Sequence, residues 1–181
     1  MKEQLWTQTI FESYGHAPTI IRTIDKRVMS LGVNSYKTSN YGKDYTLDLM
    51  DAVIELIERK KKVLKLKVLV EDTLRNISLN SAKILMRRYF DKLTLKDIAL
   101  EQHTTIGIAR RMVKKALSNA YKYFCECGYN VANIEEEFKT EKWIVGIYQR
   151  KYESLKAPKA EDKIVYIPQK SNSSFSVCFS I

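Results

Sequence analysis

Apolar residues recur at helical spacing through most of this chain, and the breaks between the apolar segments are short. Only 6 glycines and 3 prolines interrupt the 181 residues, so few positions stop a helix. The pattern therefore predicts an all-α protein.

The first 45 residues are expected to form two helices and a linker. Residues 3–14 gather Leu5, Trp6, Ile10 and Phe11 towards one side. A second helix is expected from Pro18, which suits a first helical turn, to Gly32, which suits a C-terminal cap. Residues 32–45 are polar and broken by glycines, which indicates a linker or a mobile loop.

Residues 46–78 are expected to form one long connecting helix, with Thr46 as its N-terminal cap. Its heptad-like stripe favours a spacer or a contact between two copies of the chain, and consists of Met50, Val53, Ile57, Leu64 and Val68. The basic run at residues 59–62 interrupts the stripe, which allows either one helix or two helices that meet there. The run itself is either a solvent-facing turn of helix or a phosphate contact. Beyond it, residues 64–70 are apolar enough to need partners on more than one side.

The apolar pattern of residues 79–124 predicts one helix, followed by two more helices that are joined by a tight turn. The first has an apolar face made of Ile84, Leu85, Tyr89 and Phe90, and residues 91–93 turn the chain. Thr94 can cap the next helix, residues 95–102, in a capping box closed by Asp97. His103 and Thr104 form the second turn, after which Thr105 can cap a helix over residues 106–124.

The helix at residues 106–124 has two distinct faces. The apolar face consists of Ala109, Met112, Val113, Ala116, Leu117 and Ala120. The opposite face carries Arg110, Arg111, Lys114 and Lys115. A DNA-binding helix-turn-helix places such a helix in the major groove while basic residues hold phosphates. Periodicity alone fits equally well a helical hairpin whose basic face meets water.

The charge balance narrows the choice of partner. Lysine and arginine outnumber aspartate and glutamate, giving a net charge of +10, which favours a polyanion. No apolar run is long enough to cross a bilayer, and the first residues lack the order of a signal peptide. We therefore expect a cytoplasmic protein without a membrane partner. The cysteines, Cys125, Cys127 and Cys178, are too sparse for a disulfide framework.

The sequence does not favour an enzyme or a cofactor site. His16 and His103 are the only histidines and lie far apart in the sequence, and no glycine-rich phosphate loop is present. Cys125 and Cys127 lack a second pair or a nearby histidine to complete a zinc site. The acidic residues 135–137 point in successive helical directions and cannot converge on a metal. We expect no catalytic residue, no metal and no cofactor.

Two stretches, "LMRRYFDKLTLKDIA" and "ARRMVKKAL", resemble region four of bacterial sigma factors, the module that reads the −35 promoter element. The resemblance covers residues 79–123, about a quarter of the chain. It implies duplex DNA as a partner, and RNA polymerase as a second one. It also implies that DNA is contacted by Thr94, Thr105, Ile106, Gly107, Arg110, Arg111, Lys114 and Lys115. Arg110 and Arg111 would reach base edges, and Ile106 a thymine methyl group.

The chain departs from the family pattern at three places. His103 replaces the usual turn glycine and would need a left-handed backbone conformation. Ile106 and Gly107 stand where primary sigma factors carry charged base-reading residues. The aromatic-rich pattern of region two is absent from residues 1–46. The resemblance therefore points to a sigma-like regulator of phage or mobile-element type.

The C-terminal part is less informative. Residues 125–157 are expected to contain a helix with Thr140 as its cap, ending before Pro158. Residues 158–181 hold two β-prone runs around a polar turn, which fit a small β-hairpin, a strand added to the sheet edge of a partner, or a loose tail. Three functions remain open for the whole chain: a DNA-binding transcription regulator, a helical protein–protein adaptor contacting, for example, RNA polymerase, and an accessory subunit of a DNA-processing enzyme.

Overall fold

The computed structural model describes residues 2–37 and 43–156, and this part of the chain is helical without strands. Its helices are α1 (Lys2–Tyr14), α2 (Ala17–Lys37), α3 (Lys43–Asn76), α4 (Leu79–Tyr89), α5 (Leu95–Glu101), α6 (Ile106–Glu126), α7 (Val131–Phe138) and α8 (Lys142–Lys156). The all-α prediction is confirmed over these residues. The hairpin or loose tail expected at residues 158–181 lies outside them. Within the described ranges, no helix has both the length and the hydropathy to cross a membrane.

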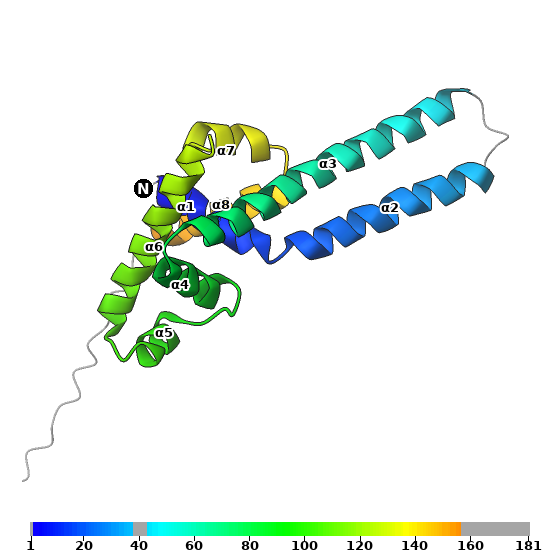
Figure 1. The fold of residues 1–181 in the computed structure, drawn as a ribbon. Helices are drawn as coiled ribbons and strands as arrows, with labels where there is room; N and C mark the ends of the chain where they lie inside the picture. The colour runs from blue at the N-terminus through cyan, green and yellow to red at the C-terminus, as the bar shows by residue number, and fades with distance from the viewer. Residues whose placement is uncertain (1, 38–42, 157–181) are drawn as a thin grey trace, which may run out of the picture.

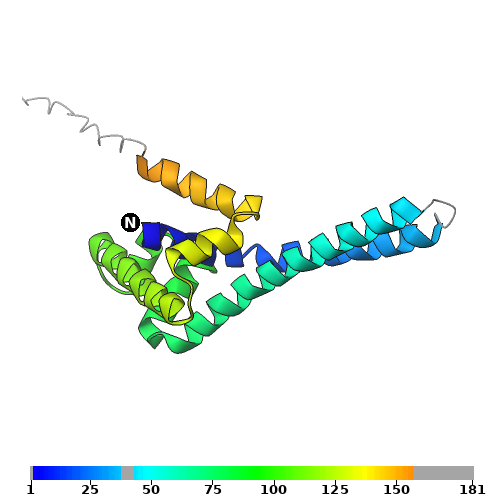
Figure 2. The same ribbon diagram turned by 90° about the horizontal axis from the view of Figure 1, so that it is seen from above.

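The helices form a body and a projecting arm (Figure 1). Helices α1 and α4–α8 make the body, whereas α2 and α3 lie side by side and extend far beyond it. The view from above shows the same division between the body and the arm (Figure 2). The C-terminal half of α3 runs back into the body, so the arm and the body share one continuous helix.

Helix α6 is the centre of the body because it packs against α1, α3, α4 and α5. Its buried side chains are Ala109, Val113, Ala116, Leu117, Ala120 and Phe124. From α1, Phe11 is fully buried and its ring lies 6.2 Å from that of Phe124 and 5.8 Å from that of Tyr89. Aromatic pairs at these separations attract beyond their buried area. The first helix is therefore part of the core that holds α4 and α6.

Two predicted helix ends in the arm are wrong. Helix α2 continues through Gly32 to Lys37, and Gly32 lacks the positive φ of a C-terminal cap. Helix α3 starts at Lys43, which puts Thr46 inside its first turn rather than at its cap. Much of the segment expected to be a linker is thus helical. The two helices pack against each other along the arm, and such packing outweighs the cost of about 1 kcal/mol for a glycine in a helix.

The basic run at residues 59–62 faces solvent in part and also contacts neighbouring helices, and its phosphate contact stays a prediction. Arg59 Nε donates to the buried carboxylate of Glu141, at 2.9 Å. Lys60 pairs with Asp25 on α2, and Lys62 Nζ donates to the hydroxyl of Thr140, at 2.9 Å. Three of the four basic side chains therefore hold α3 to its neighbours, whereas Lys61 remains exposed.

The C-terminal region contains two helices where one was expected. Asn130 caps α7 by accepting a hydrogen bond from the backbone N–H of Asn133, at 2.9 Å. Thr140 lies in the turn between α7 and α8 and does not cap α8. Its predicted role is wrong, because the carbonyl of Glu141 accepts the hydrogen bonds from Ile144 and Val145 that begin that helix.

Replacing Phe11 with Ala is expected to lower the free energy of unfolding by about 3–5 kcal/mol, because it empties a fully buried site between α4 and α6. Urea unfolding followed by circular dichroism measures this change. Met29→Ala, at a position 71% exposed on α2, is the control and should shift stability by less than about 0.5 kcal/mol. A Phe11→Ala protein as stable as the wild type would contradict the place of α1 in the core.

Candidate nucleic-acid interface

The predicted capping box at the start of α5 is confirmed. The backbone N–H of Thr94 donates to Asp97 Oδ2 at 2.8 Å, and the backbone N–H of Asp97 donates to Thr94 Oγ1 at 3.3 Å. The Thr94 hydroxyl also lies 2.7 Å from Asp97 Oδ2. These hydrogen bonds favour the ionised carboxylate and lower the pKa of Asp97. The hydroxyl of Thr94 is therefore already engaged within the chain.

The turn between α5 and α6 has the geometry that the sequence required. His103 adopts φ 49°. This is the left-handed conformation predicted for it, because it stands where the family pattern has a turn glycine. The backbone N–H of Thr104 closes the turn on the carbonyl of Ala99, at 2.8 Å. Thr105 then caps α6 as predicted by accepting from the backbone N–H of Ile108, at 3.3 Å.

Small side chains allow α5 and α6 to pack closely. Ala99 and Ala109 are both buried at the contact between the two helices. Arg87, near the end of α4, forms ion pairs with both Asp91 and Glu101, and the second of these pairs connects α4 to α5. The three helices α4, α5 and α6 thus form one unit in which the N-terminal half of α6 has a fixed direction.

The outer face of α6 meets solvent along its first half. The predicted interface residues on it are all exposed: Thr105, Ile106, Gly107, Arg110, Arg111, Lys114 and Lys115. Within the described chain, none of the four basic side chains forms an ion pair. A Cβ on Gly107 would meet nothing closer than the Thr105 hydroxyl, at 4.0 Å. Packing in this chain therefore does not require the glycine.

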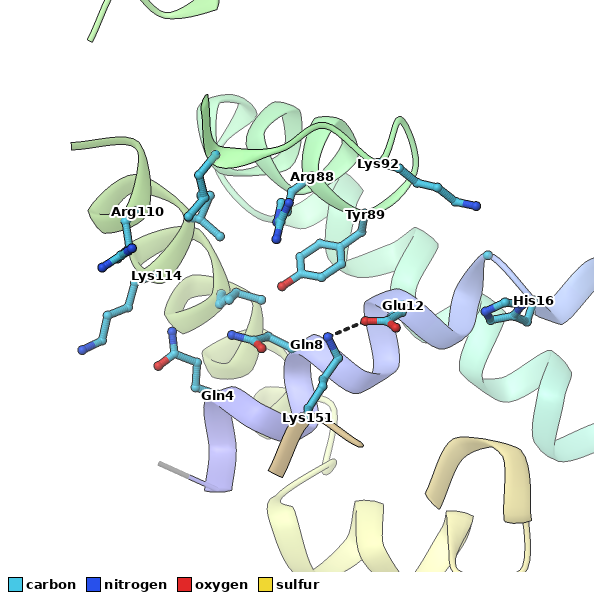
Figure 3. Close-up of a pocket in the computed structure, with 14 residues that line it drawn as sticks. Gln4, Gln8, Glu12, His16, Arg88, Tyr89, Lys92, Arg110, Lys114 and Lys151 are labelled. Atoms are coloured by element: carbon cyan, nitrogen blue, oxygen red, sulfur yellow. Dashed lines mark ion pairs between the residues drawn. The ribbon is translucent and has the colours of Figure 1, made fainter. Parts of the chain in front are cut away.

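The basic face of α6 is divided between two surroundings. Arg110 and Lys114 line a cleft of about 670 Å³, in which they lie across from Gln4 and Gln8 on α1 (Figure 3). Arg111 and Lys115 follow one position later, about 100° around the helix, and are not part of this cleft. The sequence brought the four residues together on one face, but it did not reveal that α1 flanks two of them.

The cleft is strongly electropositive. Besides Arg110 and Lys114, it is lined by Arg88 and Lys92 near the α4–α5 turn and by Lys151 on α8. Among the described residues that line it, Glu12 is the only carboxylate, and it forms an ion pair with Lys151 (Figure 3). Anionic groups entering this cleft would meet an excess of positive charge.

Tyr89 and Arg88 are two further polar residues that line the cleft. The ring of Tyr89 lies at the cleft, and burial raises the pKa of its hydroxyl, which stays protonated. Arg88 donates to the carbonyl of Leu93 at 2.7 Å, which fixes its side chain next to Tyr89. Sequence reasoning missed Arg88, Lys92 and Lys151 as a group. The first two lie within the matched motif and could have been noticed, whereas Lys151 joins them only through the fold.

Apolar side chains surround the α5–α6 turn on the surface. Leu100 is 74% exposed, Ile106 42% and Ile108 38%. An exposed apolar cluster rimmed by basic residues can contact thymine methyl groups or a protein partner.

Comparisons of the chain with protein-family models, curated proteins and solved structures found no match. The similarity to sigma region four therefore stays a prediction from the quoted motifs. Among the described residues, no three His, Cys, Asp or Glu side chains lie close enough to hold a metal ion. Cys125 and Cys127 are exposed free thiols.

Asp97→Ala is expected to destabilise the protein at neutral pH and to have little effect in acid. Because the pKa of Asp97 is lowered on folding, its stabilising contribution is present above the unfolded pKa and is lost as the pH falls through the folded pKa. Urea unfolding of both proteins, at neutral pH and in steps into the acid range, measures the difference.

Thr94→Ala tests the same box from its other side and should cost about 0.5–2 kcal/mol at neutral pH. A difference between wild type and Asp97→Ala that persists unchanged into acid would contradict the role given to the carboxylate.

Proposed function

We propose that this protein is a transcription regulator that binds duplex DNA by inserting the N-terminal half of α6 into the major groove. The observation that carries the proposal is the exposed, unpaired basic face of α6, held in a fixed direction by a capped helix-turn-helix. An α-helix fits the width of the major groove, and helix-turn-helix proteins read bases with the first turns of the second helix. The net charge of +10 supports a polyanionic partner.

The residues of the interface take different parts in this proposal. Arg110 and Arg111 are the groups proposed to reach base edges, since a guanidinium can bind guanine through two hydrogen bonds. Ile106 is proposed to contact a thymine methyl group, and Gly107 lets the backbone of α6 approach the duplex. Thr94 is already bonded to Asp97, so its part is to position α5.

Phosphate contacts come from the flanks of α6. Lys114 and Lys115 lie one turn beyond the arginines, and Thr105 offers the N-terminus of α6, where anions are favoured. The basic cleft supports one further phosphate contact, because Lys92 lies at its rim beside the α4–α5 turn. Phosphate contacts position a protein on DNA and give most of its salt dependence.

A second candidate is a helical adaptor that uses the same face for a protein partner such as RNA polymerase. The exposed Leu100, Ile106 and Ile108 favour it, because apolar anchors at the start of a helix suit docking into a groove. The adaptor would need no DNA binding of its own, so DNA affinity separates the two proposals.

The double variant Arg110→Ala, Arg111→Ala is expected to lose most DNA affinity while keeping its fold. Fluorescence anisotropy with duplexes selected from a random pool measures binding, and circular dichroism checks the fold. The matched control is Arg22→Ala, Arg27→Ala, which removes the same charge from exposed positions on the arm and should bind nearly as well as the wild type. Equal losses in the two variants would mean that only bulk charge matters.

The salt dependence of binding gives an independent check. If about four to six phosphates are neutralised, the slope of log affinity against log salt is roughly −4 to −5. Lys115→Ala should reduce the magnitude of that slope by about one. Selection that enriches no duplex, together with a flat salt response, would leave the adaptor as the function.

A further inference from the structure

Helix α3 exposes a regular apolar stripe on its solvent side. The stripe, which we call the seam, consists of Leu47, Met50, Ile54, Ile57, Lys61, Leu64 and Val68. Its members are separated alternately by three and four residues, the spacing of heptad positions a and d. The apolar members are between 39% and 60% exposed. The sequence pattern had included Val53 instead of Ile54, but Val53 is half-buried.

The seam is not the face that α3 buries. The C-terminal half of α3 buries Val63, Leu66 and Val70 instead, and Lys60 pairs with Asp25 of α2. The seam extends over about 32 Å at 1.5 Å per residue. Single exposed apolar residues are ordinary, but a continuous exposed heptad stripe of this length is the surface that coiled coils bury.

Charge along the seam differs between its two halves. The N-terminal half is flanked by the exposed carboxylates Asp48, Asp51, Glu55 and Glu58, which form no ion pair within the described residues. The C-terminal half carries Lys61, Lys62 and Lys65. Lys65 pairs with Glu137 yet its side chain remains 54% exposed. Two copies of α3 in parallel would bring like charges together, whereas antiparallel copies bring acid against base.

The middle of the seam fits a twofold axis. Glu58 and Lys61 lie at its centre, less than one helical turn apart. In an antiparallel pair, Glu58 of each copy comes beside Lys61 of the other, which gives two equivalent ion pairs, as a self-complementary interface requires. A lysine at a single core position of a coiled coil also fixes its register.

At the C-terminal end of the seam there is space for the N-terminal residues of the other copy's seam. A groove of about 440 Å³ opens there between α3 and the α6–α7 turn, lined by Leu64, Val68, Leu69 and Tyr129. The same antiparallel register brings Met50 of a second copy opposite Val68. Methionine is flexible and fills irregular apolar gaps well.

We propose that the seam is the dimerisation surface of this protein, with a second, antiparallel copy of α3 as its occupant. The proposal rests on the heptad spacing, the divided charge and the groove, and does not depend on DNA binding. Each copy would bury its apolar stripe and would place its acidic half against the basic half of the other.

Sedimentation velocity of the full chain across a range of concentrations tests the proposal. The wild type should form dimers of twice the 21.1 kDa chain mass. Ile54→Glu should be monomeric, because it puts a charge among the apolar residues of the seam's N-terminal half. Glu58→Lys and Lys61→Glu should each raise the dimer dissociation constant by about tenfold or more, because each creates two like-charge contacts.

Mixing the two charge variants distinguishes self-association from other causes. A Glu58→Lys chain and a Lys61→Glu chain have opposite charges at both central contacts, so an equimolar mixture should recover dimers that neither forms alone. Lys122→Glu and Glu126→Lys, exposed on the far end of α6, are the matched controls and should dimerise like the wild type.

The outcomes are decisive in either direction. A wild type that stays monomeric at all concentrations overturns the proposal, and leaves the seam to a different protein. Dimers that persist unchanged in Ile54→Glu also overturn it, because the contact would then lie elsewhere. Wild-type dimers together with recovery in the mixture support the antiparallel arrangement, because parallel copies would already place Lys61 beside Lys61 in the wild type. No recovery in the mixture overturns that arrangement.

Discussion

The burial of one face of α6 determines most of what this molecule can do. Because Ala109, Ala116 and Phe124 are enclosed by neighbouring helices, the opposite side of the same helix has to meet solvent. The basic residues are on that side by helical periodicity alone. Small alanines let α5 approach, and Phe11 completes the enclosure from the N-terminus.

Local signals in the sequence predicted α4, α5 and α6 well. Thr94 with Asp97 and Thr105 mark helix starts through short-range hydrogen bonds, which depend little on the rest of the fold. The left-handed His103 could likewise be predicted, because the turn itself requires that conformation. The exposure of the α6 basic face could be predicted from the helical periodicity of the sequence alone.

Long-range packing could not be predicted in the same way. Gly32 and Thr46 suggested helix ends, but the contact between α2 and α3 extends both helices past them. The basic cleft combines Lys151 and Gln4, which are far apart in sequence and meet only because α8 and α1 pack together. No spacing rule links such residues, so this part of the candidate interface had to come from the structure.

The buried carboxylate of Glu141 connects the arm to the body. It accepts hydrogen bonds from Arg59 on α3 and from the indole of Trp143 on α8, each at 2.9 Å. Separating α3 from α8 at this point would leave the buried carboxylate without the cation that pairs with it, which costs several kcal/mol. These contacts hold the arm in a fixed orientation on the body. In the proposed dimer, the register of the two α3 helices would set the distance between the two bodies, and a shift of one heptad would change that distance by about 10.5 Å.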